Sequence, residues 1–371
     1  MSKVLLISHF FESSGWGEAS RNMALAMDSV GIDVVCRNVH SNNPTAKICD
    51  RLQYLLDKDS NGCEICIQHL LPIFMAYDGN FKKCIGSFVT ESNDIEFSNY
   101  PTYLDCMDEL WVSSEYCENA VFDLGIDEEK IKIVPHAFDS EKYDKDYGVL
   151  DIPQVKTSYT FYYIGEAIKR KNLMALIKAF HTEFSPNEPV ELVLKVSRQG
   201  LNEQQTLAFM QELCATAKQN LKLYSDISQY KQEILITSRL TEEEIYKLHN
   251  SCDCFVLTSY GEGWCIPLWE AGALGNACIY PNVGGHTEYT PDLSCRYHVN
   301  GHYVPCFGFI DSGLPELGSS REGGYEIDLY SLMRKMRNAY QTGKKKYDNS
   351  FLKTRYSYQS VGQRIKDLLC I

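Results

Sequence analysis

The feature that most constrains the fold is a short apolar strand followed by a glycine loop and a helix, because this pattern occurs twice. Residues 4–7 form the first apolar run, and residues 15–27 follow it with two glycines and then a helical pattern. The same order restarts with an apolar run at residues 161–165 and a helical stripe over residues 173–180. A strand that feeds a helix and then a parallel strand is the building unit of α/β sheets. The sequence therefore predicts two parallel-sheet units.

Further short apolar runs fill both units and predict their remaining strands. They cover residues 32–36, 65–67, 84–89, 109–112 and 132–134 in the first unit, and 190–196, 234–237, 254–258 and 277–280 in the second. A polar, aperiodic stretch over residues 143–153 separates the two units. We therefore predict a first domain over residues 1–150, a second over residues 151–350, and a C-terminal helix within residues 351–371.

Charge and composition exclude several classes of protein. The 371 residues carry 36 basic and 49 acidic side chains, so the formal net charge is −13. This balance argues against broad attraction to nucleic acid or to an anionic membrane. A hydrophobic content of 44% excludes global disorder, and no apolar run approaches the roughly 18 residues of a membrane span. The first residues predict a strand and not a signal peptide, so we expect a cytoplasmic protein without stable membrane insertion.

The cysteines predict neither a disulfide scaffold nor a metal site. Their number, fifteen, is odd, and Cys66, Cys254 and Cys278 lie inside apolar strand-like runs, as is typical of buried free thiols. Cys63 and Cys66 form the only C-x-x-C pair, and no second pair completes a zinc set. The two D-x-D strings, at residues 57–59 and 144–146, lie in polar surroundings and are interpreted as solvated charges. We expect no metal.

The most informative segment runs from residue 258 to residue 271. It follows a predicted strand and leads through Gly261 and Gly263 into a helix with Pro267 in its first turn. Glycines let the backbone approach a ligand closely, and the free N–H groups of a helix start bind anions. The segment therefore predicts an anion site that can hold a diphosphate.

Two carboxylates flank this predicted anion site, eight positions apart. Glu262 lies in the loop, where it can accept hydrogen bonds from sugar hydroxyls. Glu270 lies about one turn into the helix, where it can accept two hydrogen bonds from a vicinal diol such as a ribose. A carboxylate near a helix N-terminus also stabilises the helix by roughly 0.3–1 kcal/mol, which accounts for one of the two without any ligand.

The spacing of Glu262 and Glu270 resembles the E-x7-E signature of retaining glycosyltransferases of the GT-B fold, family-4 type. Nearly the whole chain is similar to that group, with five further segments in the same order: residues 15–19, 108–114, 134–139, 170–172 and 284–288. The resemblance implies two Rossmann-like parallel-sheet domains that face each other across a cleft. It also implies a C-terminal helix that crosses back to the first domain, although its stripe of Val361, Ile365 and Leu368 also suits packing within the second.

The resemblance implies roles for particular residues. Glu262, Lys171 and Arg170 would be catalytic: the two cations would neutralise the leaving diphosphate, and Glu262 would orient the transferred sugar. Two cations at a helix start oppose the helix dipole, an arrangement that favours an anion between them. The donor-binding positions would be Gly17, Gly263, Trp264, Cys265, Ile266 and Glu270, the last of these holding the ribose.

Two positions depart from the pattern of the family. Relatives often carry an arginine directly after the strand glycine, where this chain has Glu166. Many relatives also place a histidine in the middle loop of the first domain, where this chain has residues 89–92. Glu91 is therefore our candidate on the acceptor side, although a buried or capping role suits it equally. His136 is a second candidate, with a histidine held by the backbone as the alternative.

The resemblance thus implies metal-independent, retaining transfer of a sugar from a nucleotide-diphosphate sugar to a hydroxyl acceptor, with no cofactor. We expect a carbohydrate or glycan acceptor, because the acidic charge disfavours nucleic acid. A nucleotide-sugar epimerase on the same fold and a non-catalytic sugar-binding subunit remain alternatives, and Glu166 leaves the second one open. An NAD-dependent oxidoreductase is disfavoured, since residues 15–17 lack the third glycine of G-x-G-x-x-G.

Overall fold

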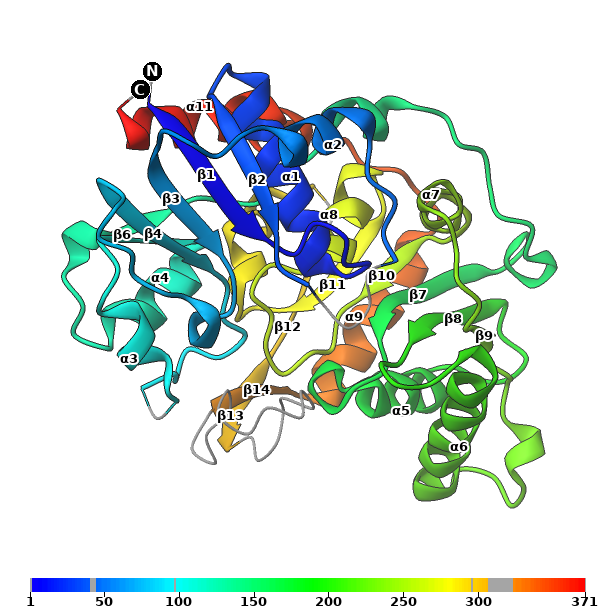
Figure 1. The fold of residues 1–371 in the computed structure, drawn as a ribbon. Coiled ribbons are helices and arrows are strands. Elements are labelled where there is room, and N and C mark those ends of the chain that lie inside the picture. Colours follow the sequence, from blue (N-terminus) through cyan, green and yellow to red (C-terminus); the bar gives the residue numbers. More distant parts are fainter. Residues whose placement is uncertain (1, 41–44, 97, 295, 306–322, 371) are drawn as a thin grey trace.

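The chain folds into two α/β units, each built on a six-stranded parallel sheet (Figure 1). This computed structural model describes residues 2–40, 45–96, 98–294, 296–305 and 323–370. The first sheet has the order β2-β1-β3-β4-β5-β6. Its strands are β1 Lys3–Ser8, β2 Val34–Asn38, β3 Cys63–His69, β4 Lys83–Phe88, β5 Glu109–Val112 and β6 Ile131–Ile133. The predicted strands of the first unit are confirmed, with ends that differ by one or two residues.

The second sheet has the order β12-β11-β10-β7-β8-β9. Its strands are β7 Tyr159–Glu166, β8 Val190–Ser197, β9 Ile234–Ile236, β10 Cys254–Val256, β11 Ala277–Pro281 and β12 Arg296–Val299. The strand order reverses between β7 and β10, and ligands bind at the carboxyl ends of strands at such a switch point. A two-stranded antiparallel hairpin, β13 Gly301–Pro305 with β14 Gly323–Ile327, was not predicted from the sequence.

Helices connect the strands and cover both sheets. They are α1 Gly15–Ser29, α2 Asp50–Asp57, α3 Tyr100–Leu104, α4 Glu115–Phe122, α5 Leu173–Glu183, α6 Glu203–Leu221, α7 Glu242–Ser251, α8 Ile266–Ala273, α9 Leu329–Thr342, α10 Ser350–Arg355 and α11 Tyr358–Leu369. One boundary was predicted wrongly: Gly15 and Gly17 lie in the first turn of α1, not in a loop before it. The reason is that Ser14 caps the helix, its side chain accepting the Gly17 N–H.

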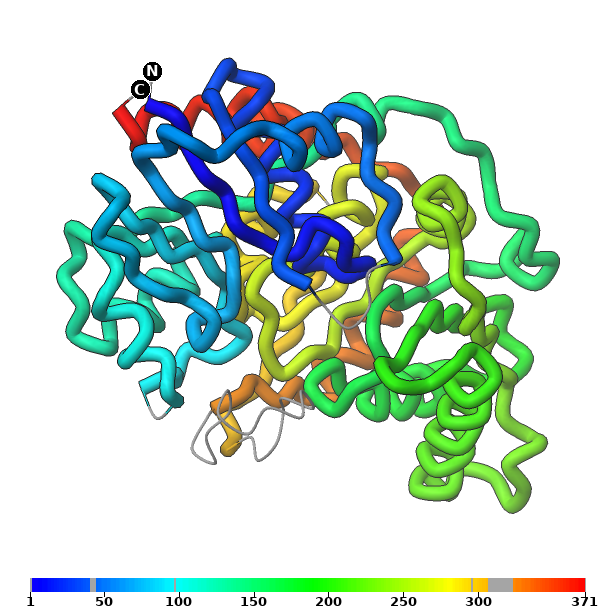
Figure 2. The backbone as a smooth tube through the Cα atoms, in the orientation of Figure 1, coloured from blue at the N-terminus to red at the C-terminus, as the bar shows by residue number. Residues whose placement is uncertain are grey.

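Each unit has its own hydrophobic core. The first sheet is buried on both faces by separate clusters, and a third cluster fills the second unit. The chain crosses between the units through the segment that follows β6 and returns through its C-terminal end (Figure 2). Phe138 and Tyr143 on this segment already pack in the second core. The boundary at residue 150 stays a prediction.

The C-terminal helix α11 crosses back to the first unit, so that the two chain ends lie side by side (Figure 1). Val361 and Ile365 are buried in the first core, and Leu368 packs against it. The Tyr358 hydroxyl donates to Asn22 Oδ1 of α1 over 2.7 Å. A Cβ on Gly362 would lie 2.2 Å from the Ala26 oxygen, so only glycine permits this close helix approach. These contacts decide between the two packings that the sequence left open.

Candidate functional site

The carboxyl ends of β7 and β10 bring two loops of the second unit together at the switch point. The first loop contains the 3-10 turn η5 Lys169–Lys171, just before α5. The second is the glycine loop over residues 259–265, just before α8. The Tyr260 N–H donates to the Arg170 oxygen over 2.9 Å, and Thr258 Oγ1 donates to the Lys171 oxygen over 3.0 Å. These bonds hold the predicted cations beside the predicted carboxylates.

Lys171, Arg170 and Glu262 form one buried cluster. Lys171 Nζ lies 2.6 Å from Glu262 Oε1, and the Arg170 guanidinium lies 3.3 Å from Glu262 Oε2. Ser259 Oγ donates to the same carboxylate over 2.5 Å. Arg170 also donates to the Gly261 oxygen over 2.7 Å and pairs with Glu91 of the first unit at 3.1 Å. The structure therefore brings together all three residues predicted to be catalytic, and adds Glu91 to them.

Electrostatics keep this cluster charged. Burial alone would raise the pKa of Glu262, but Lys171 and Arg170 outweigh burial and lower that pKa to about 2. Burial lowers the pKa of Arg170, while Glu91 and Glu262 outweigh it and raise that pKa. Without a ligand, the anion between the two cations is the Glu262 carboxylate. Two cations face two carboxylates, so a diphosphate that enters must share or displace these partners.

Glu270 has the opposite environment. It is buried in α8, where the Tyr143 hydroxyl donates to its Oε1 over 3.2 Å and His249 Nε2 lies 3.5 Å from its Oε2. Burial raises the pKa of Glu270 to about 8, and the bond from Tyr143 offsets only part of that rise. The pKa of Glu18 on α1 is also raised to about 8, by burial and by the nearby charge of Glu270. A partly buried carboxyl group of the first unit is thus electrostatically coupled to the buried Glu270 of the second.

The glycines of the loop serve close packing between the two units. A Cβ on Gly261 would lie 1.9 Å from the Glu91 oxygen, and a Cβ on Gly263 would lie 2.8 Å from Val89 Cβ. Ser113 Oγ of the first unit donates to the Gly263 oxygen over 2.9 Å. The sequence predicted that these glycines admit a ligand. In this structure the backbone that approaches them belongs to the chain's own first unit.

The start of α8 has an uncommon backbone conformation. Cys265, its N-cap residue, has a left-handed φ of 69°. A residue with a Cβ pays of order 1–3 kcal/mol for such a conformation, and such residues cluster at functional sites. Ile266 faces α1, since a Cβ on Gly15 would lie 3.6 Å from Ile266 Cδ1. The N-terminal turn of α1, which contains Gly17, therefore faces the start of α8.

His69 is a candidate site residue that the sequence analysis missed. It ends β3 with its side chain 2% exposed, and its Nδ1 lies 3.0 Å from Ser87 Oγ. Among the described residues, its Nε2 is buried without a hydrogen-bond partner. Burial lowers the pKa of His69 to about 3, and its ring stacks on Trp16 at 5.0 Å. A histidine at the carboxyl end of a predicted parallel strand was the signal available in the sequence.

His136 connects His69 to the glycine loop. Its ring meets His69 edge-on at 6.5 Å and Trp264 at 5.2 Å. Burial lowers the pKa of His136 to about 4. Trp264 is buried, and its indole nitrogen has no hydrogen-bond partner in the described part of the chain. A row of neutral rings therefore runs from the first unit to the glycine loop of the second.

The remaining predicted features are placed as follows. The Glu166 carboxylate accepts the Gln199 N–H over 3.0 Å, so it binds the backbone just after the end of β8. The thirteen cysteines in the described residues are all free, while Cys295 and Cys306 lie outside those residues. In the described ranges, no group of three or more His, Cys, Asp or Glu side chains is arranged to hold a metal. No helix in the same ranges is both long and apolar enough to cross a bilayer.

Comparisons with known proteins agree with this geometry. Residues 151–303 match the family model of the glycosyl transferases group 1, and no curated protein matches the chain. The fold is similar to that of HepE from Anabaena in complex with UDP-glucose, with 12% identity, a TM-score of 0.65 and 100% of both chains covered.

Two sugar-phosphate synthases are similar over the same length. The sucrose-phosphate synthase of Thermosynechococcus elongatus has 12% identity and a TM-score of 0.64, with 100% of this chain and 98% of that chain covered. The UDP-forming α,α-trehalose-phosphate synthase of Burkholderia xenovorans has 9% identity and a TM-score of 0.66, with both chains fully covered. These likenesses show the GT-B fold. Together with the family match, they support glycosyl transfer as the general class of activity.

Proposed function

We propose that this protein is a retaining glycosyltransferase that moves a sugar from a nucleotide-diphosphate sugar to a hydroxyl acceptor. The observation that carries the proposal is the convergence of Lys171 and Arg170 on Glu262 beside the start of α8. Glu270 lies in the same short helix. The site thus offers cations for a diphosphate and carboxylates for hydroxyls at the switch point of the sheet, where ligands bind in this kind of fold.

In the proposed reaction, Lys171 and Arg170 neutralise the charge that develops on the departing diphosphate. The N–H groups at the start of α8 add favourable dipoles on the same side. The acceptor oxygen bonds to the anomeric carbon as the bond to the phosphate oxygen breaks, on the same face of the sugar. The departing phosphate oxygen takes the acceptor's proton. The protein contributes positioning and charge stabilisation, and these cations supply the stabilisation without a metal.

The carboxylates and rings have separate proposed tasks. Glu262, held ionised by its cations, accepts hydrogen bonds from the transferred sugar. Glu270 in its ionised form accepts two from the ribose. His69 offers a buried Nε2, which has no hydrogen-bond partner among the described residues, to a hydroxyl of the sugar or acceptor. Glu91 and His136 lie on the acceptor side. The complex of HepE with UDP-glucose supports a nucleotide sugar as the donor. We propose a carbohydrate or glycan as the acceptor.

A non-catalytic sugar-binding subunit is the second candidate. Glu166 stands where relatives often have an arginine, and its carboxylate accepts a hydrogen bond from the backbone just after β8. The contact between Arg170 and Glu262 favours a catalyst, because Arg170 supplies the second cation from a different position. The two candidates differ in one respect: only the transferase converts its donor.

The test begins with a thermal-shift screen of nucleotide sugars, because a ligand that binds the native state raises the melting temperature. The donor that stabilises the protein is then assayed for hydrolysis and transfer, and NMR assigns the anomer of the product. Glu262→Ala and Lys171→Ala should each lower kcat by about 10²–10³-fold. Glu243→Ala and Lys145→Ala, which change exposed residues away from the site, are the matched controls.

Three results would contradict the proposal in separate ways. Donor binding without turnover would favour the non-catalytic subunit. An inverted product would overturn retention and leave glycosyl transfer in place. Loss of activity in EDTA, restored by a divalent cation, would overturn the proposal that Lys171 and Arg170 act without a metal.

A further inference from the structure

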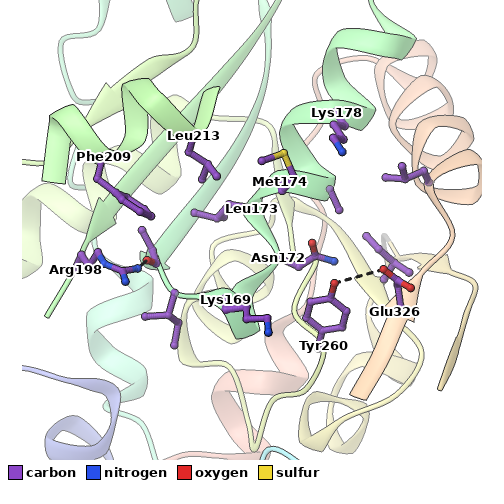
Figure 3. Close-up of a pocket in the computed structure, with 15 residues that line it drawn as sticks. Lys169, Asn172, Leu173, Met174, Lys178, Arg198, Phe209, Leu213, Tyr260 and Glu326 are labelled. Carbon is purple, nitrogen blue, oxygen red and sulfur yellow. Dashed lines mark hydrogen bonds between the residues drawn. The ribbon is translucent and has the colours of Figure 1, made fainter. Parts of the chain in front are cut away.

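A cavity of about 480 Å³ lies beside the η5 turn, and Glu262 is not among the residues that line it (Figure 3). Its walls come from η5, the first half of α5, the middle of α6, the end of β14 and the side chain of Tyr260. The volume lies within the range of about 300–1,000 Å³ that is usual for small-molecule sites. None of the residues predicted to be catalytic or donor-binding lines it.

One part of the cavity is apolar. Met174 from α5 and Phe209 and Leu213 from α6 contribute side chains to it, and all three are only partly buried. The Arg198 guanidinium lies over the Phe209 ring at 4.5 Å from its centroid, and Arg198 also donates to the Ala167 oxygen. A planar or apolar group that enters here would cover apolar side chains that water now contacts.

The charged part of the cavity is basic. Three of its lining residues, Lys169, Lys178 and Arg198, are cations, and one, Glu326, is acidic. The Tyr260 hydroxyl donates to Glu326 Oε1 over 3.4 Å, as Figure 3 shows. Among the described lining residues, cations therefore outnumber acids by three to one, in a chain whose formal net charge is −13. Such a local basic cavity favours an anion over a neutral ligand.

The cavity and the candidate donor site share two pieces of backbone. Within η5, Lys169 lines the cavity, whereas Arg170 and Lys171 contact Glu262. Tyr260 lines the cavity, and its own N–H donates to the Arg170 oxygen. A ligand that shifted Lys169 or Tyr260 would therefore also shift the two cations of the donor site.

We propose that this cavity is a second small-molecule site, for a small organic anion with an aromatic or apolar body. The phosphate or carboxylate group lies against Lys169 and Lys178, and the body lies against Phe209 and Leu213. Occupancy sets the position of η5 and so changes the affinity for the nucleotide sugar, by a coupling that must be reciprocal. Only this effect on the donor rests on the proposed function; binding of the anion does not.

Calorimetry on the full chain tests the proposal, with phenyl phosphate as the probe. We expect one phenyl phosphate per chain and weaker binding of inorganic phosphate, which lacks the ring. Benzoate in a parallel titration shows whether a carboxylate replaces the phosphate. Lys178→Glu and Phe209→Ala should each weaken binding of phenyl phosphate by at least about threefold. Lys145→Glu makes the same charge change outside the cavity and should leave binding unaltered.

Lys171→Ala separates the cavity from the donor site. We expect this variant to bind phenyl phosphate as the unaltered chain does, whether or not it turns over a nucleotide sugar. Binding that is lost in Lys171→Ala and kept in Lys178→Glu would place the anion in the donor site and overturn the proposal. No binding of either phenyl phosphate or benzoate up to about 10 mM would also overturn it. Circular dichroism and melting temperature confirm that each variant is folded.

Discussion

The carboxyl ends of the strands of the two sheets meet between the units. These two ends, called the edges below, differ in their chemistry. The edge of the second sheet is charged, with Lys171, Arg170 and Glu262 in contact. The edge of the first sheet is built from neutral rings, with His69 stacked on Trp16 and His136 beside it. Burial leaves the His69 and His136 rings of the first edge neutral, because no carboxylate in the described part of the chain pairs with them. In the second, ion pairs overcome the same penalty.

This contrast separates two tasks within the proposed reaction. Preorganised charges stabilise a transition state in which charge develops, and here that charge develops on the diphosphate. Neutral imidazole and indole groups recognise hydroxyls and sugar faces without perturbing charge. We therefore expect changes in the second sheet's edge to act mainly on kcat, and changes in the first sheet's edge to act mainly on KM.

The largest expected effect tests whether the charged edge and the neutral edge have separate tasks. Lys171→Gln, which keeps a polar side chain without the charge, should lower kcat/KM by about 10²–10³-fold, chiefly through kcat. His69→Gln should lower kcat/KM by about tenfold, chiefly through KM for the sugar donor or the acceptor. Steady-state kinetics with both substrates varied measure each constant. If His69→Gln reduced kcat as strongly as Lys171→Gln, the division of tasks between the edges would be refuted.

The pH dependence sharpens the comparison further. The pKa values of His69 and His136 are lowered to about 3 and 4, so both rings stay neutral from pH 5 upward. The pKa of Glu270 is raised to about 8, and the proposed contact with the ribose uses its ionised form. Donor binding must then release a proton, so affinity should rise with pH up to about 8, by at most tenfold per pH unit. Calorimetry between pH 5 and pH 9 measures this slope.

Glu270→Gln and Glu18→Gln are a matched pair for that experiment. Both carboxyl groups have a pKa near 8, and the charge of Glu270 acts on Glu18, but only Glu270 is proposed to touch the donor. Glu270→Gln should remove most of the slope and weaken binding at pH 8, whereas Glu18→Gln should retain a slope. If the slope persisted in Glu270→Gln and disappeared in Glu18→Gln, the proposed contact between Glu270 and the ribose would be wrong, and Glu18 would be the group that releases the proton.

Stability should change with pH in the opposite direction. The pKa of Glu270 in the folded state, about 8, lies above its ordinary value of 4.5. The folded state therefore holds a proton that the unfolded state releases, and the free energy of unfolding falls as pH rises from 4.5 to 8. The fall is at most about 1.4 kcal/mol per pH unit for each such group. Urea denaturation across this range should give a shallower fall for Glu270→Gln.

The sequence predicted the second edge better than the first, for a physical reason. Glycines, a helix-start proline and two carboxylates at fixed spacing identify the loop before α8, because their effects are local. The end of β3 precedes irregular backbone, where no local pattern distinguishes a site histidine such as His69 from a core histidine. The contact between His69 and Trp16 joins positions 53 residues apart. Only the strand order makes them neighbours.

The fold was predictable to a similar degree. Parallel strands buried on both faces are near-continuous apolar runs, so eleven of the twelve strands in the two sheets were predicted. The strand β12 was not predicted, and the order of the strands within each sheet came only from the structure. The return of α11 to α1 was not decided by its stripe, because an amphipathic helix packs against any apolar surface. Gly362 and Ala26 determine that packing through their close approach. The hairpin β13–β14 escaped prediction, because a two-stranded ribbon has little apolar periodicity to reveal it.

The smallest expected effect concerns the ion pair between Glu91 and Arg170, which joins the two edges. Glu91 pairs with Arg170 at 3.1 Å, and its side chain is 39% exposed. If Arg170 must turn toward the diphosphate, Glu91 competes with the donor for that cation. Glu91→Gln should then tighten donor binding by up to about fivefold, the scale of an exposed ion pair. Calorimetry with the donor found in the screen measures the change.

Asp94→Asn is the matched control, since it removes the same charge three residues along the same loop. An acceptor-side role for Glu91 makes a second, separate prediction: KM for the acceptor rises in Glu91→Gln while donor affinity improves. If donor affinity fell instead, Glu91 would help to orient Arg170 for the diphosphate and would not compete with it. The first sheet's edge would then contribute the charge of Glu91 to the chemistry of the second. The contrast between a neutral and a charged edge would apply only to the aromatic and histidine rings of the first.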